Sequence, residues 1–278
     1  MHFNFHFTAV QILWTLTFAA SLVLLVVLLG RERARRYPWF TAMAALAALR
    51  LLCSRMLFGR LPQITLGGIF IVLAAVSAVV ALLVVAELAR RAFGGVRRRT
   101  MAIWILAFVV IGGGVAGAWG SWPASWKSIS PNSPLATLGL VQLLAQRLSV
   151  MVDVLTVGLG VVMVLYGRRY GAGWHSHTQR ITIGLSTASI SQLGVQAIWQ
   201  LIARSAVPQS MAEYARVIGI RERLLNGNSA VYIAVLVWWI VCLWIDEPGA
   251  ARPGDLAALP TGGSSTLAPG DPRKEAGG

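Results

Sequence analysis

The chain has 278 residues, of which 56% are hydrophobic and only 12% are charged, and its mean hydropathy is +0.68. A soluble domain carries about 25% charged residues, so this composition excludes an ordinary soluble protein and predicts a membrane protein. The formal net charge of +14 comes from arginine, because Lys127 and Lys274 are the only lysines. Most of the arginines fall between apolar runs, a pattern typical of cytoplasmic loops, and nucleic-acid binding is therefore not expected.

Seven apolar runs predict an all-α, polytopic membrane bundle of seven transmembrane helices within residues 1–247. The runs are Val10–Leu29, Phe40–Phe58, Ile64–Leu88, Met101–Trp119, Leu135–Tyr166, Thr178–Ala203 and Ala230–Ile245. Arginine clusters follow the first, third and fifth runs, and the loops after the second and fourth runs carry few charges. This bias predicts an N-terminus outside the cell and a C-terminus in the cytoplasm. The sixth loop follows neither pattern, because it mixes Arg216, Arg221 and Arg223 with Glu213 and Glu222.

Shorter signals mark the ends of these runs. Pro38 is placed to start the second helix, and Glu87 is placed to pair with Arg91, four residues later on the helix surface. Ser210 and Glu213 have the spacing of a capping box, which predicts a short amphipathic helix near residues 211–225 that stops at Asn226-Gly227. The tail, residues 248–278, is rich in Gly, Pro and Ala and is expected to be disordered in the cytoplasm.

The fifth run carries polar side chains within a segment that is otherwise apolar enough to lie in a bilayer. Steps of three and four residues separate Gln142, Gln146, Ser149, Asp153, Thr156 and Gly160. This spacing places them on one stripe of a helix. Because a carboxylate in hydrocarbon is costly, we expect the stripe to face other helices or trapped water.

Residues on three helices fall at one depth. Counted from the cytoplasmic ends of their helices at 1.5 Å per residue, Arg50, Asp153 and Gln192 each lie roughly 18 Å into the membrane. Arginine can bind a carboxylate through two parallel hydrogen bonds. We therefore predict an ion pair between Arg50 and Asp153, with Gln192 or Ser189 making the remaining hydrogen bonds. Such a pair either serves a function or only fixes the register of the helices.

A wider polar network is expected around this pair, either as contacts between helices or as the wall of a path. Its predicted members are Gln146, Ser149, Ser189, Gln192 and Gln196. Closer to the outer surface, Arg55 and Arg147 form a basic layer. These arginines either line an anionic pocket or extend to lipid headgroups, and the second alternative is favoured.

The sequence offers no recognisable catalytic, cofactor or metal site. The seventh run has no lysine, which excludes a retinal Schiff base, and the four histidines lie outside the apolar runs, which argues against haem. His175 and His177 have no carboxylate or cysteine nearby in sequence, so a solvated loop is favoured over a metal site. With no nucleophile and base to assemble, an enzyme is disfavoured.

Three segments resemble uncharacterised bacterial seven-helix integral membrane proteins of similar length. They are His2–Thr8 (HFNFHFT), Tyr37-Pro38-Trp39 with the arginines before it, and Trp238–Pro248 (WWIVCLWIDEP). The resemblance covers the whole chain except the tail. It implies a protein of the bacterial inner membrane, and it implies no activity and no catalytic or binding residues.

Two functions are compatible with these features. The favoured one is a sensor or interaction subunit, which would act through a protein partner in the bilayer or a small intramembrane ligand, because no soluble output domain is attached. The alternative is a small-solute transporter or channel with a polar path between the fifth and sixth helices, although no internal repeat supports it. A polar opening that reaches Asp153 would favour transport, whereas dry packing around a closed ion pair would favour sensing or a structural role.

Overall fold

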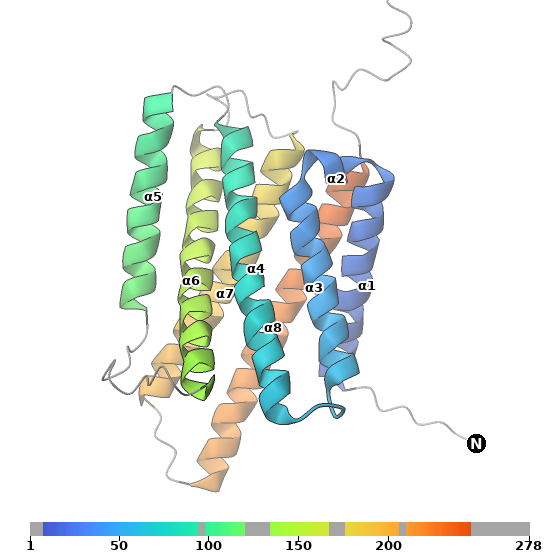
Figure 1. Cartoon of the computed structure of the whole chain (residues 1–278), viewed down its shortest axis with the longest axis vertical. Helices are drawn as coiled ribbons and strands as arrows, with labels where there is room; N and C mark the ends of the chain where they lie inside the picture. The colour runs from blue at the N-terminus through green and yellow to red at the C-terminus, as the bar shows by residue number, and fades with distance from the viewer. Residues whose placement is uncertain (1–7, 94–97, 120–133, 167–175, 206–209, 246–278) are drawn as a thin grey trace, which may run out of the picture. The chain divides into compact units, whose positions relative to one another are not determined.

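A computed structural model describes residues 8–93, 98–119, 134–166, 176–205 and 210–245 of the chain. All regular elements in these residues are helices (Figure 1). They are α1 (Ala9–Gly30), α2 (Arg33–Arg36), α3 (Pro38–Leu57), α4 (Gln63–Ala92), α5 (Arg98–Ala118), α6 (Pro134–Tyr166), α7 (His177–Ser205) and α8 (Met211–Trp244). The predicted tail, residues 248–278, lies outside the described residues.

Six of these helices, namely α1, α3, α4, α6, α7 and α8, are long and apolar enough to cross a membrane. They form a ring in the order α1, α3, α4, α6, α7 and α8, and α8 packs back against α1. α4 also contacts α7 across the ring. α5 stands outside the ring and, among the described elements, contacts α6 alone (Figure 1). Its apolar stretch in the described residues is shorter, Val109–Ala118, so a seventh span stays a prediction.

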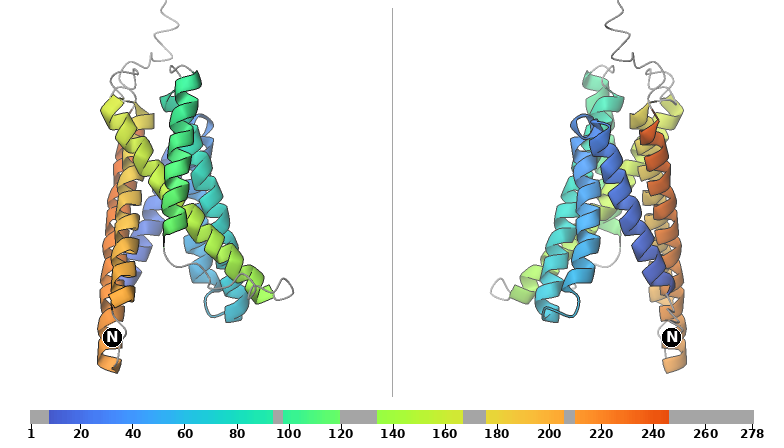
Figure 2. Two further views of the ribbon diagram at one scale, coloured as in Figure 1. Left: turned by 90° about the vertical axis from the view of Figure 1, so that its left-hand side faces the viewer. Right: turned by 90° about the vertical axis from the view of Figure 1, so that its right-hand side faces the viewer.

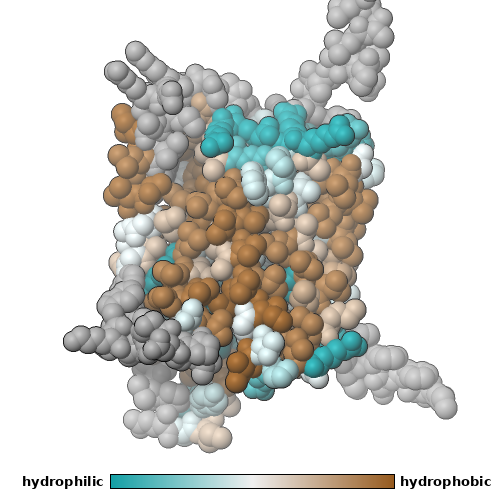
Figure 3. All heavy atoms as spheres, viewed as in Figure 1, coloured by the Kyte–Doolittle hydropathy of each residue, from teal (hydrophilic) through white to brown (hydrophobic). Residues whose placement is uncertain are grey.

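The bundle presents an apolar belt to its surroundings. Val26, Ile64 and Leu165, from α1, α4 and α6, are 67%, 70% and 68% exposed. Figure 3 shows apolar side chains across the middle of the visible face and hydrophilic side chains gathered where α1 ends and α3 begins. A soluble monomer rarely exposes so much contiguous apolar surface, and the six long apolar helices make this a multi-pass membrane protein.

The two ends of the ring differ in packing. One end, here called the Arg-rich end, carries the exposed side chains of Arg31, Arg35, Arg36, Arg90 and Arg91. Directly inside it lies the buried apolar core, contributed by α1, α3, α4, α6, α7 and α8 together with Tyr37 and Phe93. Away from this end the helices separate, and Figure 2 shows α4 and α6 leaning away from α7 and α8. The ring is therefore packed at one end and divergent at the other.

The core is centred on aromatic residues. Phe40 of α3 meets Trp239 of α8 edge to face, with ring centroids 5.0 Å apart and planes at 88°. The indole N–H of Trp239 donates to the Ile181 carbonyl oxygen of α7 at 3.3 Å. Such contacts join α3, α7 and α8 where they converge, and edge-to-face pairs add about 0.5–1.5 kcal/mol beyond apolar burial.

Glu87 links α4 to the start of α3. The predicted pair with Arg91 is confirmed at 3.2 Å, but Glu87 is buried rather than part of a surface pair. The second carboxylate oxygen of Glu87 accepts a hydrogen bond from the Trp39 N–H at 3.2 Å. This N–H lies in the first turn of α3, where the helix has no carbonyl group to accept it. Pro38 occupies the first turn of α3 as predicted. A carboxylate at this position also interacts favourably with the positive end of the helix dipole.

α8 is longer than the sequence predicts. It starts as expected, because the Ser210 hydroxyl accepts the Glu213 N–H at 3.2 Å. The predicted stop at Asn226-Gly227 is wrong, since the helix runs from Met211 to Trp244 without a break. A single helical glycine costs about 1 kcal/mol relative to alanine. Side-chain hydrogen bonds that hold Asn228 to α7 outweigh this local signal.

Candidate functional site: a polar cavity within the ring

A cavity of about 640 Å³ lies inside the ring, in the half away from the apolar core. It is bounded by α3, α4, α6 and α7. The α4 wall is built largely of small side chains, with Ala74, Ala78 and Ala81 on one face beside Ser77. Because these side chains are short, α4 contacts its neighbours and still leaves space between α3 and α6. The volume is within the usual range for a small-molecule site.

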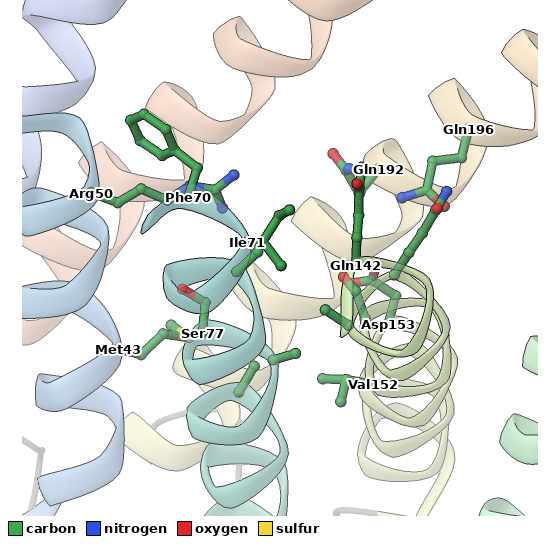
Figure 4. Close-up of a pocket in the computed structure, with 16 residues that line it drawn as sticks. Met43, Arg50, Phe70, Ile71, Ser77, Gln142, Val152, Asp153, Gln192 and Gln196 are labelled. Atoms are coloured by element: carbon green, nitrogen blue, oxygen red, sulfur yellow. The ribbon is translucent and has the colours of Figure 1, made fainter. Parts of the chain in front are cut away.

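The opposite wall is polar. Gln142, Gln146, Ser149 and Asp153 of α6 line the cavity together with Gln192 and Gln196 of α7. As predicted, the α6 stripe is turned toward other helices, although Gln142 and Gln146 are exposed within the cavity rather than packed against them. Figure 4 shows the labelled glutamines and Asp153 facing Arg50 from the other side of the space. Arg50, Asp153 and Gln192, which are predicted to lie at one depth, line the same cavity.

The remaining two stripe residues lie in a tight α6–α7 contact beyond the cavity. The Ser186 hydroxyl of α7 donates to the Thr156 carbonyl oxygen of α6 at 2.9 Å. A methyl group added to Gly160 would lie 2.8 Å from the Ser186 Cβ, closer than carbon atoms pack. Glycine at 160 thus permits the close approach of two helices, as small residues do in membranes.

Asp153 stands where the polar wall ends. One carboxylate oxygen accepts a hydrogen bond from the Ser189 hydroxyl at 2.8 Å, which confirms the predicted involvement of Ser189. The other oxygen, Oδ2, is buried and has no hydrogen-bond partner among the described residues. Asp153 also lines a second cavity of about 310 Å³ that reaches toward Tyr232 and Trp239 of α8. It therefore lies at the junction of two cavities.

Arg50 lies on the α3 wall and does not form the predicted ion pair. Within the described part of the chain, no salt bridge joins Arg50 to Asp153, and the guanidinium makes no hydrogen bond. Arg50 also lines a third cavity of about 540 Å³, between α1, α3, α4 and α8. The expected direct contact is replaced by two charges on separate walls, because α4 lies between α3 and α6 in the ring.

The polar network extends to a residue that the sequence interpretation missed. The Asn228 amide of α8 donates to the Gln192 side-chain oxygen at 2.7 Å and accepts from the Ser191 hydroxyl at 2.8 Å. Asn228 was expected just after a helix stop, whereas it lies inside a spanning helix. Of the predicted members, Ser189 and Gln192 are bonded to other helices, and Gln146, Ser149 and Gln196 line the cavity.

The predicted basic layer divides into two kinds of residue. The Arg147 guanidinium donates to the Ala116 carbonyl oxygen of α5 at 2.9 Å, so it binds the end of α5 rather than extending to headgroups. A cation at a helix C-terminus is favourable because the last carbonyl groups lack helical partners. Arg55 is exposed at the end of α3 and lines none of the three cavities.

No metal site is visible in the described residues, where no group of three or more His, Cys, Asp or Glu side chains gathers. His177 is fully buried at the start of α7 and is hydrogen-bonded to Arg33, which corrects the expectation of a solvated loop there. His175, its predicted companion, lies outside the described residues.

Comparisons with protein-family models, with curated proteins and with solved structures find no match for this chain. What the site can do therefore rests on its geometry. That geometry is a cavity with a cation on one wall and a carboxylate on the other, closed beyond by an apolar core.

Proposed function

We propose that this chain is a transporter of a small polar solute in the bacterial inner membrane. The observation that carries the proposal is the cavity, whose polar wall leads to Asp153, where a second cavity continues toward Trp239 of the buried apolar core. A structural ion pair would bring its two charges together and exclude water. Here the charges line a solute-sized space instead, which is the arrangement expected of an intramembrane binding site.

The charge pattern suggests which side of the membrane the cavity faces. Arginine accumulates on the cytoplasmic side, so we assign the Arg-rich end to the cytoplasm. With α5 counted as a seventh span, the N-terminus is outside and the tail is cytoplasmic. The cavity then faces outward and the apolar core seals the inner side. Transport would require the core to open while the outer half closes, as in alternating access.

The packing is compatible with such a motion. The helices are joined tightly at the Arg-rich end and diverge at the other end (Figure 2). α4 and α7 are the elements that contact across the ring, so their contact is a candidate pivot. A rocking of α3, α4 and α6 against α7, α8 and α1 would exchange one open side for the other without breaking any helix.

A sensor or interaction subunit is the second candidate. It is favoured by α5, which contacts only α6 among the described elements and leaves Ile103 and Leu106 67% and 64% exposed. Because α5 packs against the bundle on one side, its other side is available to a protein partner in the membrane. The same cavity would then bind a ligand without passing it across the bilayer.

Cysteine accessibility distinguishes these functions. In a chain with Cys53 and Cys242 replaced by alanine, Ser149→Cys places a thiol in the cavity, and Ser186→Cys places one in the packed α6–α7 contact as the control. A membrane-impermeant methanethiosulfonate is applied to right-side-out and to inverted membrane vesicles. Labelling of Ser149→Cys from both sides, with little labelling of Ser186→Cys, supports transport. Labelling from the outside alone favours sensing, and no labelling from either side contradicts both.

A further inference from the structure

The α3 wall of the cavity carries a cation whose hydrogen-bonding capacity is unused. Arginine has five N–H donors in a planar fork that fits a carboxylate. In the described residues the Arg50 guanidinium has no acceptor, and Figure 4 shows it extending from α3 into the cavity beside Phe70. Arg50 is exposed within the cavity, so its N–H donors are available to an anionic group.

The opposite wall, formed by α6 and α7, has hydrogen-bond acceptors that lack donors. Asp153 Oδ2 and the Gln196 side-chain oxygen are both buried, and neither accepts a hydrogen bond from a described residue. Both residues line the same cavity. Two acceptors without donors, one of them charged, suit a group with several N–H donors and a positive charge. A primary ammonium group, with three donors, has that chemistry.

The charged groups on the two walls, Arg50 and Asp153, do not form an ion pair with each other. On the α4 wall of the cavity, Ile71, Ala74 and Ala78 are apolar and cannot satisfy either charge, and the Ser77 hydroxyl already donates to the Leu73 carbonyl oxygen at 2.7 Å. A ligand with one charge would neutralise one wall and leave the other uncompensated in a low-dielectric site. A ligand with both charges would satisfy both walls and add no net charge to the membrane interior.

We infer that the cavity binds a small zwitterionic solute, with its carboxylate at Arg50 and its ammonium group at Asp153 and Gln196. The inference rests on the proposed function, because it names the class of solute that the same cavity takes. A cavity of about 640 Å³ accommodates an amino acid of a few carbon atoms together with ordered water.

The experiment uses solutes matched in length and different in charge. The full chain, purified into lipid nanodiscs, is titrated with linear amino acids from glycine through γ-aminobutyrate to δ-aminovalerate. The alkanoate and the alkylammonium of each chain length serve as the singly charged counterparts. We expect one or more zwitterions to bind, and the matched singly charged solutes to bind at least about tenfold more weakly, since each lacks one charge-assisted hydrogen-bonded contact.

Variants assign each charge of the solute to its wall. Asp153→Asn keeps the shape and the Ser189 hydrogen bond, and Arg50→Gln removes the cation; each should weaken zwitterion binding about 10- to 100-fold. Arg50→Lys keeps the charge without the fork and should weaken binding less than Arg50→Gln. Arg55→Gln removes an arginine from the same helix outside the cavity and should leave binding unchanged. Thermal unfolding of each variant verifies that it is folded.

The outcomes separate this inference from the proposed function. If Ser149→Cys is labelled from both sides but alkylammonium or alkanoate binds as tightly as the zwitterion, the zwitterion inference is wrong and the proposed transport function stands. Failure of every zwitterion to bind also overturns the inference. If, in addition, Ser149→Cys is not labelled from both sides, the proposed transport function fails with it.

Discussion

A close approach between α7 and α8 occurs at Gly184, and a single added methyl group tests how rigid the sealed half of the ring is. The Cβ of Gly184→Ala would lie 2.8 Å from Trp239 Cε2, well inside van der Waals contact. Trp239 is 1% exposed and packs against Phe40 on another helix, so the indole has little room to move. The helices must therefore separate or the ring must turn.

The expected cost follows from these contacts. Overpacking a well-packed core costs about 1–3 kcal/mol. Displacing the indole also weakens its hydrogen bond to Ile181, worth about 1 kcal/mol. Alanine regains about 0.5–1 kcal/mol of helix propensity over glycine. The free energy of unfolding of Gly184→Ala should thus fall by roughly 1–3 kcal/mol.

The control lies ten residues further along the same helix. A methyl group on Gly194 would meet no atom within 4 Å, so Gly194→Ala should be as stable as the parent or slightly more stable. Thermal unfolding can be followed with a maleimide dye that reacts with Cys242, which is 6% exposed, in a Cys53→Ser background. Equal unfolding temperatures for the two alanine variants would refute the packing described for the Arg-rich end.

Other contacts give predictions of the same kind, each checked by the same unfolding assay. Glu87→Ala should cost about 1–3 kcal/mol, because it leaves the Trp39 N–H without its carboxylate acceptor; Glu87→Gln, which can still accept, should cost less. Asn228→Ala should cost about 1–2 kcal/mol through loss of its bonds to α7, and no loss would mean that α7 and α8 do not depend on them. Arg147→Gln should weaken the contact between α5 and α6 and lower the unfolding temperature, whereas Arg55→Gln should not.

The sequence predicted best those features that depend on the residues of a single helix. The spacing of polar residues on α6 predicted which face meets other protein, because a helix of fixed pitch converts spacing into direction. The depth argument predicted that Arg50, Asp153 and Gln192 share one level, and the three residues line the same cavity. The rise per residue is constant, so no knowledge of neighbouring helices was needed.

Contacts that depend on neighbouring helices could not be predicted in this way. The separation of Arg50 from Asp153 depends on how α4 is inserted between α3 and α6, and on the small side chains that make room there. The continuation of α8 past Gly227 depends on hydrogen bonds that Asn228 makes to α7. Glu87 looked like half of a local pair because its second partner, the Trp39 N–H, is 48 residues away.

A structure of the full chain in a lipid nanodisc, determined by electron cryomicroscopy with a bound antibody fragment, tests the central claim most directly. We predict ordered water or solute density that reaches Asp153 from the side opposite the Arg-rich end, with the Arg50 guanidinium beyond salt-bridge distance, about 4 Å, of the carboxylate. A collapsed cavity in which Arg50 and Asp153 are directly paired, with apolar packing around them on all sides, would contradict it.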